Sequence, residues 1–176
     1  MKDKFDELFE LIKDPLPPGG VKTDNSIIFV YPPDKELDFR EYLLDTFVPL
    51  LQARKIRFRL LDLGGFVFES LDETLVQNLS EDEFDEYQWM KQGLSRQIER
   101  ALQEQVTKLA SETPGGTIII YSAASLYPLV RFGEVLRELR ESKCRIVLGF
   151  PGEERGGKLH YMNQPDGSNY LAIKIT

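Results

Sequence analysis

Glycine-rich stretches are the first candidates for chemistry in this chain. A phosphate-binding loop needs G-x-x-x-x-G-K-[ST] between a strand and a helix, so that backbone N–H groups and a lysine surround the phosphates. Residues 152–158, GEERGGK, resemble this pattern superficially, but they are acidic, one residue short and followed by Leu159. The loop at 32–35, PPDK, has no glycine and contains two residues without N–H donors. The sequence therefore predicts no phosphate-binding loop.

Nucleophiles and metal ligands are scarce. His160 is the only histidine and Cys144 the only cysteine, which excludes the usual zinc ligand sets. Ser122 or Ser125 could be grouped with His160 and Asp62, but no G-x-S-x-G elbow supports this grouping. We expect a packed or surface histidine and a small core cysteine. The sequence thus predicts no catalytic residue.

Acidic side chains are the remaining candidates for a metal site. Asp34, Glu153 and Glu154 follow expected strands, Asp62 lies near the end of another, and the four could gather around magnesium. Acidic residues are common in surface loops, so we predict no metal site and no cofactor.

The segment Y-P-x-x-R, made by Tyr127, Pro128 and Arg131, allows two interpretations. In the first, Tyr127 fixes the turn and Arg131 is presented to an anion or a partner carboxylate. In the second, Arg131 ties its own loop to Asp34 or Glu153. The residue types alone leave both open.

Short apolar runs rich in β-branched residues predict the strands that position these loops. They lie at 27–31, 56–63, 117–121 and 145–150. The second run alternates apolar and charged residues, which suggests a place towards a sheet edge. Phe150-Pro151-Gly152 is expected to form a rigid strand exit. We predict an α/β fold with a mostly parallel sheet of about four strands, flanked by helices.

Helical spacing of apolar residues fills the gaps between the strands. In the segment after Pro33, we expect Asp34 to cap the helix and Pro49 to kink or break it. The residues expected to face the core there are Leu37, Leu44, Phe47 and Leu51. Pro128 is expected in the first turn of a helix whose apolar stripe includes Leu129, Val135 and Leu139.

Two further features follow from the pattern. Residues 66–79 are expected to be helical, and a capping box at 80–83 predicts the start of a long helix over 81–111. Residues 158–162 and 170–175 are strand-like and joined by turn residues, so we expect a C-terminal β-hairpin.

Composition limits the class of protein. We expect a single domain over residues 1–176, in which 1–20 form a helix and a Pro/Gly loop. The net charge of −7 argues against strong direct nucleic-acid binding, and the basic run 54–59 reads as a solvated strand entrance. No apolar stretch approaches the ~20 residues of a membrane helix. One cysteine fits a reducing cytosol, so we predict a cytoplasmic protein.

Taken in order, several short motifs resemble the BrxB family of bacteriophage exclusion (BREX) systems. The opening F-D-E-L-F-E-L-I is followed by V-Y-P-P-D-K-E-L-x-x-R-E-Y, then Y-P-x-x-R, I-V-L-G-F-P-G and a final N-Y-L-A-I-K-I. The residues that carry the likeness are Tyr31, Pro32, Pro33, Leu37, Arg40, Tyr42, Tyr127, Pro128, Arg131, Phe150, Pro151, Gly152, Gly156, Leu159, Asn169 and Tyr170.

This resemblance implies a small protein encoded with a phosphatase-like PglZ protein, a large BrxC ATPase and a DNA methyltransferase. It implies a P-loop-type core that has lost its phosphate loop, and a role in assembly. Two hypotheses follow. The first is a non-catalytic adaptor that docks the PglZ-type protein, and in addition the BrxC-type ATPase, through the long helix or the terminal hairpin. The alternative is a nucleotide- or metal-binding enzyme that uses Asp34, Asp62, Arg131 and Lys158.

Overall fold

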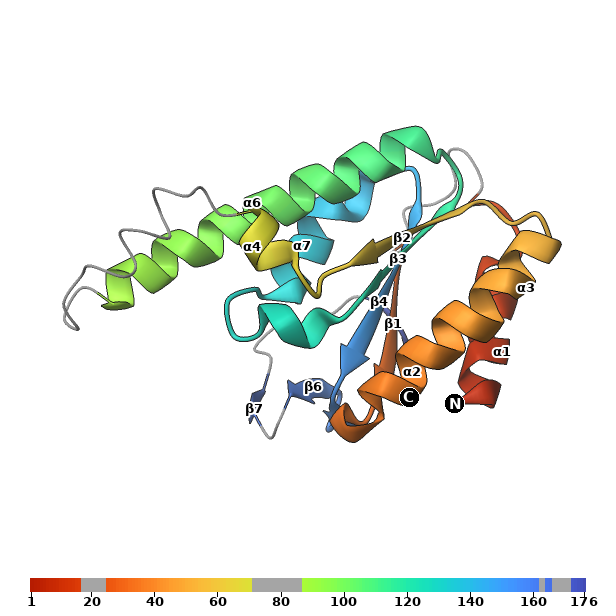
Figure 1. Ribbon diagram of the computed structural model, residues 1–176, viewed down its shortest axis with the longest axis horizontal. Coiled ribbons are helices and arrows are strands. Elements are labelled where there is room, and N and C mark those ends of the chain that lie inside the picture. Colours follow the sequence, from red (N-terminus) through yellow and green to blue (C-terminus); the bar gives the residue numbers. More distant parts are fainter. Residues whose placement is uncertain (17–24, 71–86, 162–163, 166–171) are drawn as a thin grey trace.

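A parallel sheet of five strands forms the centre of the molecule (Figure 1). The computed structural model describes residues 1–16, 25–70, 87–161, 164–165 and 172–176. The strands, in sheet order, are β2 (Phe58–Asp62), β3 (Thr117–Tyr121), β4 (Arg145–Pro151), β1 (Ser26–Tyr31) and β8 (Ile173–Ile175). All neighbouring pairs are parallel. The predicted α/β class and the four predicted strands are confirmed, and β8 adds a fifth.

Burial follows the position of each strand in the sheet. Every residue of β1 and β3 is buried, because both faces of these inner strands are covered. In β2, by contrast, Arg59 is exposed and Leu61 is buried. This strand lies at one edge of the sheet, as its alternating sequence predicted.

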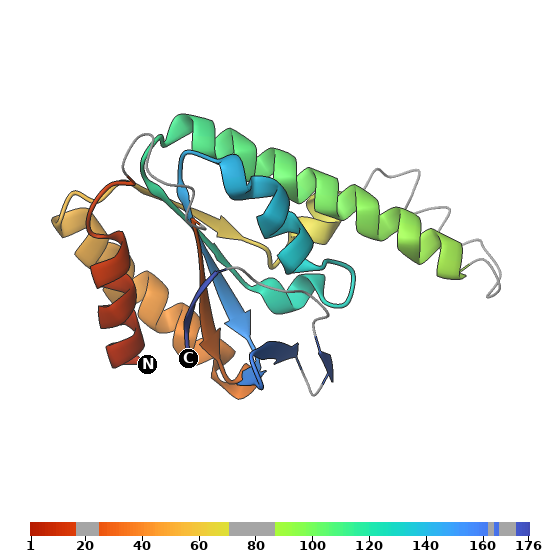
Figure 2. The same ribbon diagram turned by 180° about the vertical axis from the view of Figure 1, so that it is seen from behind.

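Helices cover both faces of the sheet (Figures 1 and 2). One face carries α1 (Lys2–Ile12), α2 (Glu36–Glu41), the π-helical turn η2 (Tyr42–Phe47) and α3 (Val48–Ala53). The other carries α4 (Phe66–Ser70), α6 (Tyr87–Glu112) and α7 (Phe132–Glu138), which η4 (Leu139–Glu141) extends. On the first face, Phe5 of α1 packs its ring against Phe29 and Phe47 at centroid distances of 4.6 and 4.9 Å. These contacts form an aromatic core layer.

The helix after β1 differs from its prediction in three respects. Asp34 makes no capping hydrogen bond and lies exposed in a short 3-10 turn, η1 (Pro33–Lys35). Leu37 is 74% exposed, and Phe39 and Leu43 are buried in its place. Pro49 neither breaks nor ends the helix, because the wider turn η2 precedes it and leaves room for the proline ring.

The long helix is confirmed as α6, which has 26 residues and is about 39 Å long. Ile98, Leu102 and Val106 form its buried stripe. Figure 1 shows that its first half extends beyond the sheet. The expected capping box at 80–83 and the helical continuation at 71–79 lie outside the described residues. The described start of that segment, α4, is helical as predicted.

The predicted C-terminal hairpin is present, but one of its strands is different. Strand β6 (Lys158–Tyr161) pairs antiparallel with β5 (Glu153–Arg155) and with β7 (Gln164–Pro165). Gly156 and Gly157 form the two-residue turn between β5 and β6, and both have positive φ, as such tight turns require. The expected partner strand near the C-terminus is instead β8, which pairs parallel with β1.

Candidate functional site

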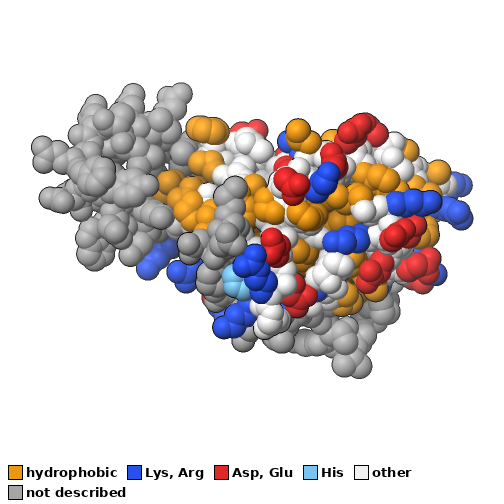
Figure 3. Space-filling view, turned by 90° about the horizontal axis from the view of Figure 1, so that it is seen from below, with side chains coloured by type: hydrophobic (Ala, Val, Ile, Leu, Met, Phe, Trp, Pro, Cys, Tyr) orange, Lys and Arg blue, Asp and Glu red, His pale blue; other side chains and the backbone are white. Residues whose placement is uncertain are grey.

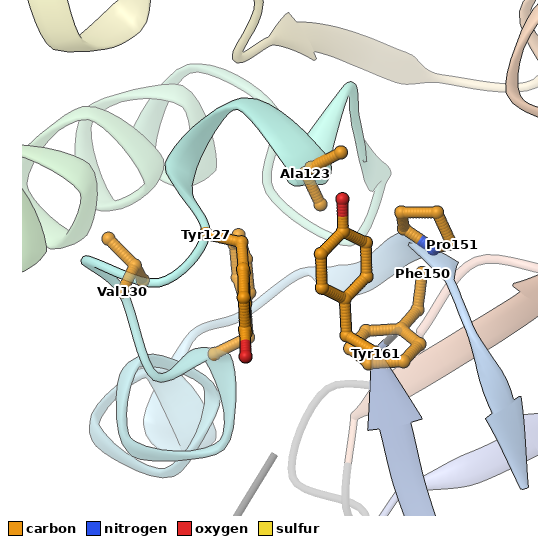
Figure 4. Close-up of a pocket in the computed structure, with 8 residues that line it drawn as sticks. Ala123, Tyr127, Val130, Phe150, Pro151 and Tyr161 are labelled. Carbon is orange, nitrogen blue, oxygen red and sulfur yellow. The ribbon is translucent and has the colours of Figure 1, made fainter. Parts of the chain in front are cut away.

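An apolar hollow lies at the carboxyl ends of the parallel strands, where ligands and partners bind in open α/β sheets (Figure 4). It contains about 240 Å³ of empty space, including the part that opens to solvent. Its walls are the segment between β3 and α7, the end of β4, and β6 of the small sheet. The lining residues are Ala123, Ala124, Tyr127, Val130, Phe132, Phe150, Pro151 and Tyr161.

The first wall begins where β3 ends. Ser122 has φ of 60°, and the chain then forms the 3-10 turn η3 (Ala123–Leu126). The Ser125 hydroxyl donates a 2.5 Å hydrogen bond to the carbonyl of Leu63, which anchors this turn to the end of β2. Tyr127 is extended, as residues before proline tend to be, and the Tyr127–Pro128 peptide bond is cis.

Pro128 lies in a turn and is not part of a helix, which corrects the sequence prediction. Helix α7 begins four residues later, at Phe132, and Arg131 is its N-cap residue. Leu129 is also outside the helix and is only half-buried, while Val135 and Leu139 are buried as predicted. The residue before a proline avoids helical geometry, so the chain turns here before a new helix can begin.

Two tyrosine rings meet across the hollow. The rings of Tyr127 and Tyr161 have centroids 4.3 Å apart and are tilted by 48°. Figure 4 shows that the two hydroxyl groups point in opposite directions. Tyr161 is a functional candidate that the sequence analysis missed. The available signal was strand alternation, since Leu159 and Tyr161 share one face of β6 and Leu159 is buried.

The end of β4 forms the floor. Phe150 and Pro151 are buried and line the hollow, and the chain turns at Gly152. The backbone N–H of Gly152 donates to the carbonyl of Tyr31 at 2.7 Å, and β4 ends at Pro151, where the sequence placed the strand exit. The Tyr31 hydroxyl donates to the Glu36 carboxylate at 2.6 Å. Burial, with this hydrogen bond, raises the pKa of Tyr31.

Arg131 stands in the chain between the lining residues Val130 and Phe132. Its backbone N–H donates to Glu99 at 3.2 Å, and its side chain is exposed. Among the described residues no ion pair involves the Arg131 guanidinium. Glu153 is paired with Arg155 at 2.7 Å instead. The interpretation in which Arg131 ties its loop to Asp34 or Glu153 is therefore wrong.

A second polar group of residues lies at the ends of β2 and β3. Asp62 and Tyr121 are neighbours in register, and Oδ1 of Asp62 accepts the N–H of Gly64 at 2.9 Å. Partial burial raises the pKa of Asp62, but the nearby Ser122 hydroxyl, this N–H and the Arg40 charge outweigh it and hold the pKa below its ordinary value. The Ser122 hydroxyl is buried and makes no hydrogen bond of ordinary length within the described ranges.

The residues of the enzyme hypothesis are spread over the molecule. Asp34 follows β1 and Asp62 ends β2, and these strands are three positions apart in the sheet, or about 14 Å. Lys158 begins β6, where its segment forms a hairpin and no phosphate loop. The ring of His160 contacts the Lys158 carbonyl at 3.2 Å. No three His, Cys, Asp or Glu side chains converge as a metal site in the described part of the chain.

Figure 3 shows the molecule from the side of the strand ends. Hydrophobic side chains gather in a band across this face, with acidic and basic side chains beside them. Contiguous apolar surface of this kind is typical of contact sites. Among the described residues, no helix is both long enough and apolar enough to cross a bilayer.

Fold and site together define a parallel-sheet α/β protein with an apolar hollow at its strand ends. Comparison with protein-family models matches residues 61–175 to the family described as "BREX protein BrxB". The match covers more than half of the chain and includes every residue that lines the hollow, and the chain therefore belongs to the BrxB family. Membership indicates a component of BREX phage defence. No curated protein and no solved structure gives a significant match.

Proposed function

We propose that this protein is a non-catalytic adaptor of a BREX complex and that it docks a PglZ-type protein at the apolar hollow. The apolar lining of the hollow carries the proposal. Sites for small molecules combine an apolar lining with a few convergent polar groups that fix the ligand. None of the eight residues that line this hollow is charged, and most are aliphatic or aromatic. An apolar surface of this kind suits contact with apolar side chains of a protein partner.

The surface of α6 favours the hollow over the helix as the docking site. From Gly93 to the end of the helix, its exposed residues are small or polar. They are Gly93, Arg96, Arg100, Glu104, Thr107, Lys108, Ser111 and Glu112. A polar, solvated face supplies little binding energy. The small sheet remains part of the proposed surface, because Tyr161 of β6 lines the hollow. A BrxC-type ATPase is the second partner that we propose, on another face.

Co-elution of the full chain with a PglZ-type protein at physiological salt tests the adaptor role. Ala124→Leu should fill the hollow and weaken the complex, while Arg100→Ala on the exposed face of α6 should leave it intact. Circular dichroism of both variants checks that the fold is retained. Absence of a complex with the wild-type chain would contradict the proposed partner. An unchanged complex with Ala124→Leu would exclude the hollow as its docking site.

The proposal also covers location and nucleic acid. We place the protein in the cytoplasm, where its single thiol stays reduced. We expect no strong direct DNA binding, because the net charge is −7 and the exposed basic run at 54–59 is short. Salt-dependent retention of the isolated chain on DNA would contradict this expectation.

The alternative, a nucleotide- or metal-binding enzyme, predicts stabilisation by its ligand. A bound ligand raises the melting temperature, because it stabilises only the folded state. Scanning calorimetry with and without ATP and magnesium measures this shift, and the Asp62→Ala variant should lose it. An unchanged melting temperature of the wild-type chain would remove this alternative.

A further inference from the structure

The walls of the hollow favour a flat ring as its occupant. The rings of Tyr127 and Tyr161 are half-buried and packed on each other at 4.3 Å, so each keeps part of its surface for a further contact. Phe132 and Phe150 add two more aromatic side chains to the lining. Aromatic pairs gain about 0.5–1.5 kcal/mol beyond the area they bury. A ring therefore gains more here than an aliphatic side chain of similar size.

The rim favours a negative charge beside that ring. Arg131 is flanked in sequence by Val130 and Phe132, which both line the hollow. Its side chain is exposed, and no ion pair in the described part of the chain occupies its guanidinium. Glu99 of α6 accepts the backbone N–H of Arg131 at 3.2 Å, and in the small sheet Glu153 pairs with Arg155 and Glu154 with Lys174. A carboxylate from outside is thus the group that this rim complements.

We propose that the hollow recognises one aromatic side chain of the protein partner together with an adjacent carboxylate, which pairs with Arg131. This inference deepens the proposed function and rests on it, since it specifies the chemistry of the partner segment. The ring supplies most of the contact, and the carboxylate supplies orientation and salt dependence. Tyrosine and arginine are both enriched among the residues that dominate binding at protein interfaces.

Three small probes test this chemistry without the partner. The first, 3-phenylpropionate, carries a ring and a carboxylate; 3-phenylpropionamide keeps the ring without the charge; 4-methylpentanoate keeps the charge without the ring. Each is titrated into the isotope-labelled full chain while the NMR signals of Ala124, Tyr127 and Tyr161 are followed. We expect 3-phenylpropionate to bind about twofold to fivefold more tightly than its amide, the range for one exposed ion pair. The 4-methylpentanoate probe should bind more weakly than 3-phenylpropionate.

Two variants assign each part of the effect. Arg131→Gln should make 3-phenylpropionate and its amide bind equally, and raising the salt to 0.5 M should do the same in the wild-type chain. Ala124→Leu should weaken binding of all three probes. The matched control is Arg100→Gln, an exposed arginine of α6 that should change nothing.

The outcomes separate this inference from the proposed function. If 3-phenylpropionate and its amide bind equally to the wild-type chain, the proposed recognition of a carboxylate is wrong. If 3-phenylpropionate and 4-methylpentanoate bind equally, the proposed preference for an aromatic ring is wrong. Absence of any shift at the three signals would overturn the whole inference. If the PglZ-type complex still forms and still depends on Ala124, the adaptor proposal survives such a result. If the probes bind as expected but the wild-type chain forms no complex with the PglZ-type protein, only the adaptor proposal is contradicted.

Discussion

The backbone N–H of Gly152 donates a 2.7 Å hydrogen bond to the carbonyl oxygen of Tyr31. This bond extends the pairing of β4 and β1 by one position, at the point where the chain leaves the main sheet for β5. A Cβ atom on Gly152 would lie 2.3 Å from the carbonyl oxygen of His160. The small sheet therefore packs directly on this backbone, and through Tyr161 it forms one wall of the hollow.

Gly152→Ala should destabilise the fold. The added methyl would also lie 2.4 Å from Cε1 of Phe150, so the ring and β6 must both move. Overpacking of this kind costs about 1–3 kcal/mol of unfolding free energy, which urea titration measures. The matched control is Gly93→Ala in α6, where the new methyl meets no atom within 4 Å. That variant should gain up to about 1 kcal/mol in helix propensity. Equal stability of the two variants would contradict this account of Gly152.

Lys174→Met should loosen the small sheet from the end of β8. The ammonium of Lys174 donates to Glu154 at 3.2 Å and to the carbonyl of Gly157 at 2.8 Å, and its side chain is 18% exposed. We expect a loss of about 1 kcal/mol and faster amide exchange in β5 and β6. Lys35→Met serves as the control, because its pair with Asp38 is exposed. Unchanged exchange in β5 and β6 would show that this lysine does not hold them.

Asp62 should contribute to stability in a pH-dependent way. Partial burial raises its pKa, but Ser122, the Gly64 N–H and Arg40 outweigh burial, and the net pKa lies below 3.8. A carboxyl with a lowered pKa in the folded state stabilises the fold above its unfolded pKa. That stabilisation disappears as the pH falls below about 4 and through the folded pKa. Asp62→Asn should therefore flatten the acid side of the stability profile. An unchanged profile between pH 5 and pH 2 would refute this role.

Cys144 should be unreactive in the folded protein. Its side chain is fully buried, its Sγ–H donates to the carbonyl of Thr113 at 2.8 Å, and burial raises the pKa of the thiol. Labelling by a thiol reagent then requires opening of the core, so it should be on the order of 1,000-fold slower than in the unfolded chain. Because Cys144 is the only cysteine, the absorbance of the coloured leaving group that the reagent releases reports labelling at this site alone. Rapid labelling of the native protein would show an accessible thiol.

Much of the fold could be predicted because the signals are local. The buried runs that became β1, β3 and β4 are rich in β-branched residues, and a strand covered on both faces needs no other pattern. The charged residues of β2 placed it correctly at an edge. The stripe of Ile98, Leu102 and Val106 predicted α6 for the same reason, since one helical face must be buried.

The candidate site was predicted only in part. Tyr127, Phe150 and Pro151 were singled out and do line the hollow, and Arg131 stands in the chain between the lining residues Val130 and Phe132. Tyr31 and Gly152 do not line the hollow, but their hydrogen bond joins β1 to the chain directly after the lining residue Pro151. Asp34, which the enzyme hypothesis grouped with Arg131, is not among the lining residues and lies exposed in η1. Sequence motifs identified the chain segments that meet at the hollow. They did not predict which of these segments contact one another.

Residue patterns determined the α/β class, the inner strands and the absence of a phosphate-binding sequence, because each depends on neighbours in the chain. Tertiary contacts decided the rest. Ile175 is buried beside β1, so the last strand joins the main sheet, while the turn at Gly156 and Gly157 supplies β6 with a partner in β5. The pairing of β6 with β5 also brings Tyr161 against Tyr127. Short strands are stabilised by whichever long-range packing buries them best, and no local pattern encodes that choice.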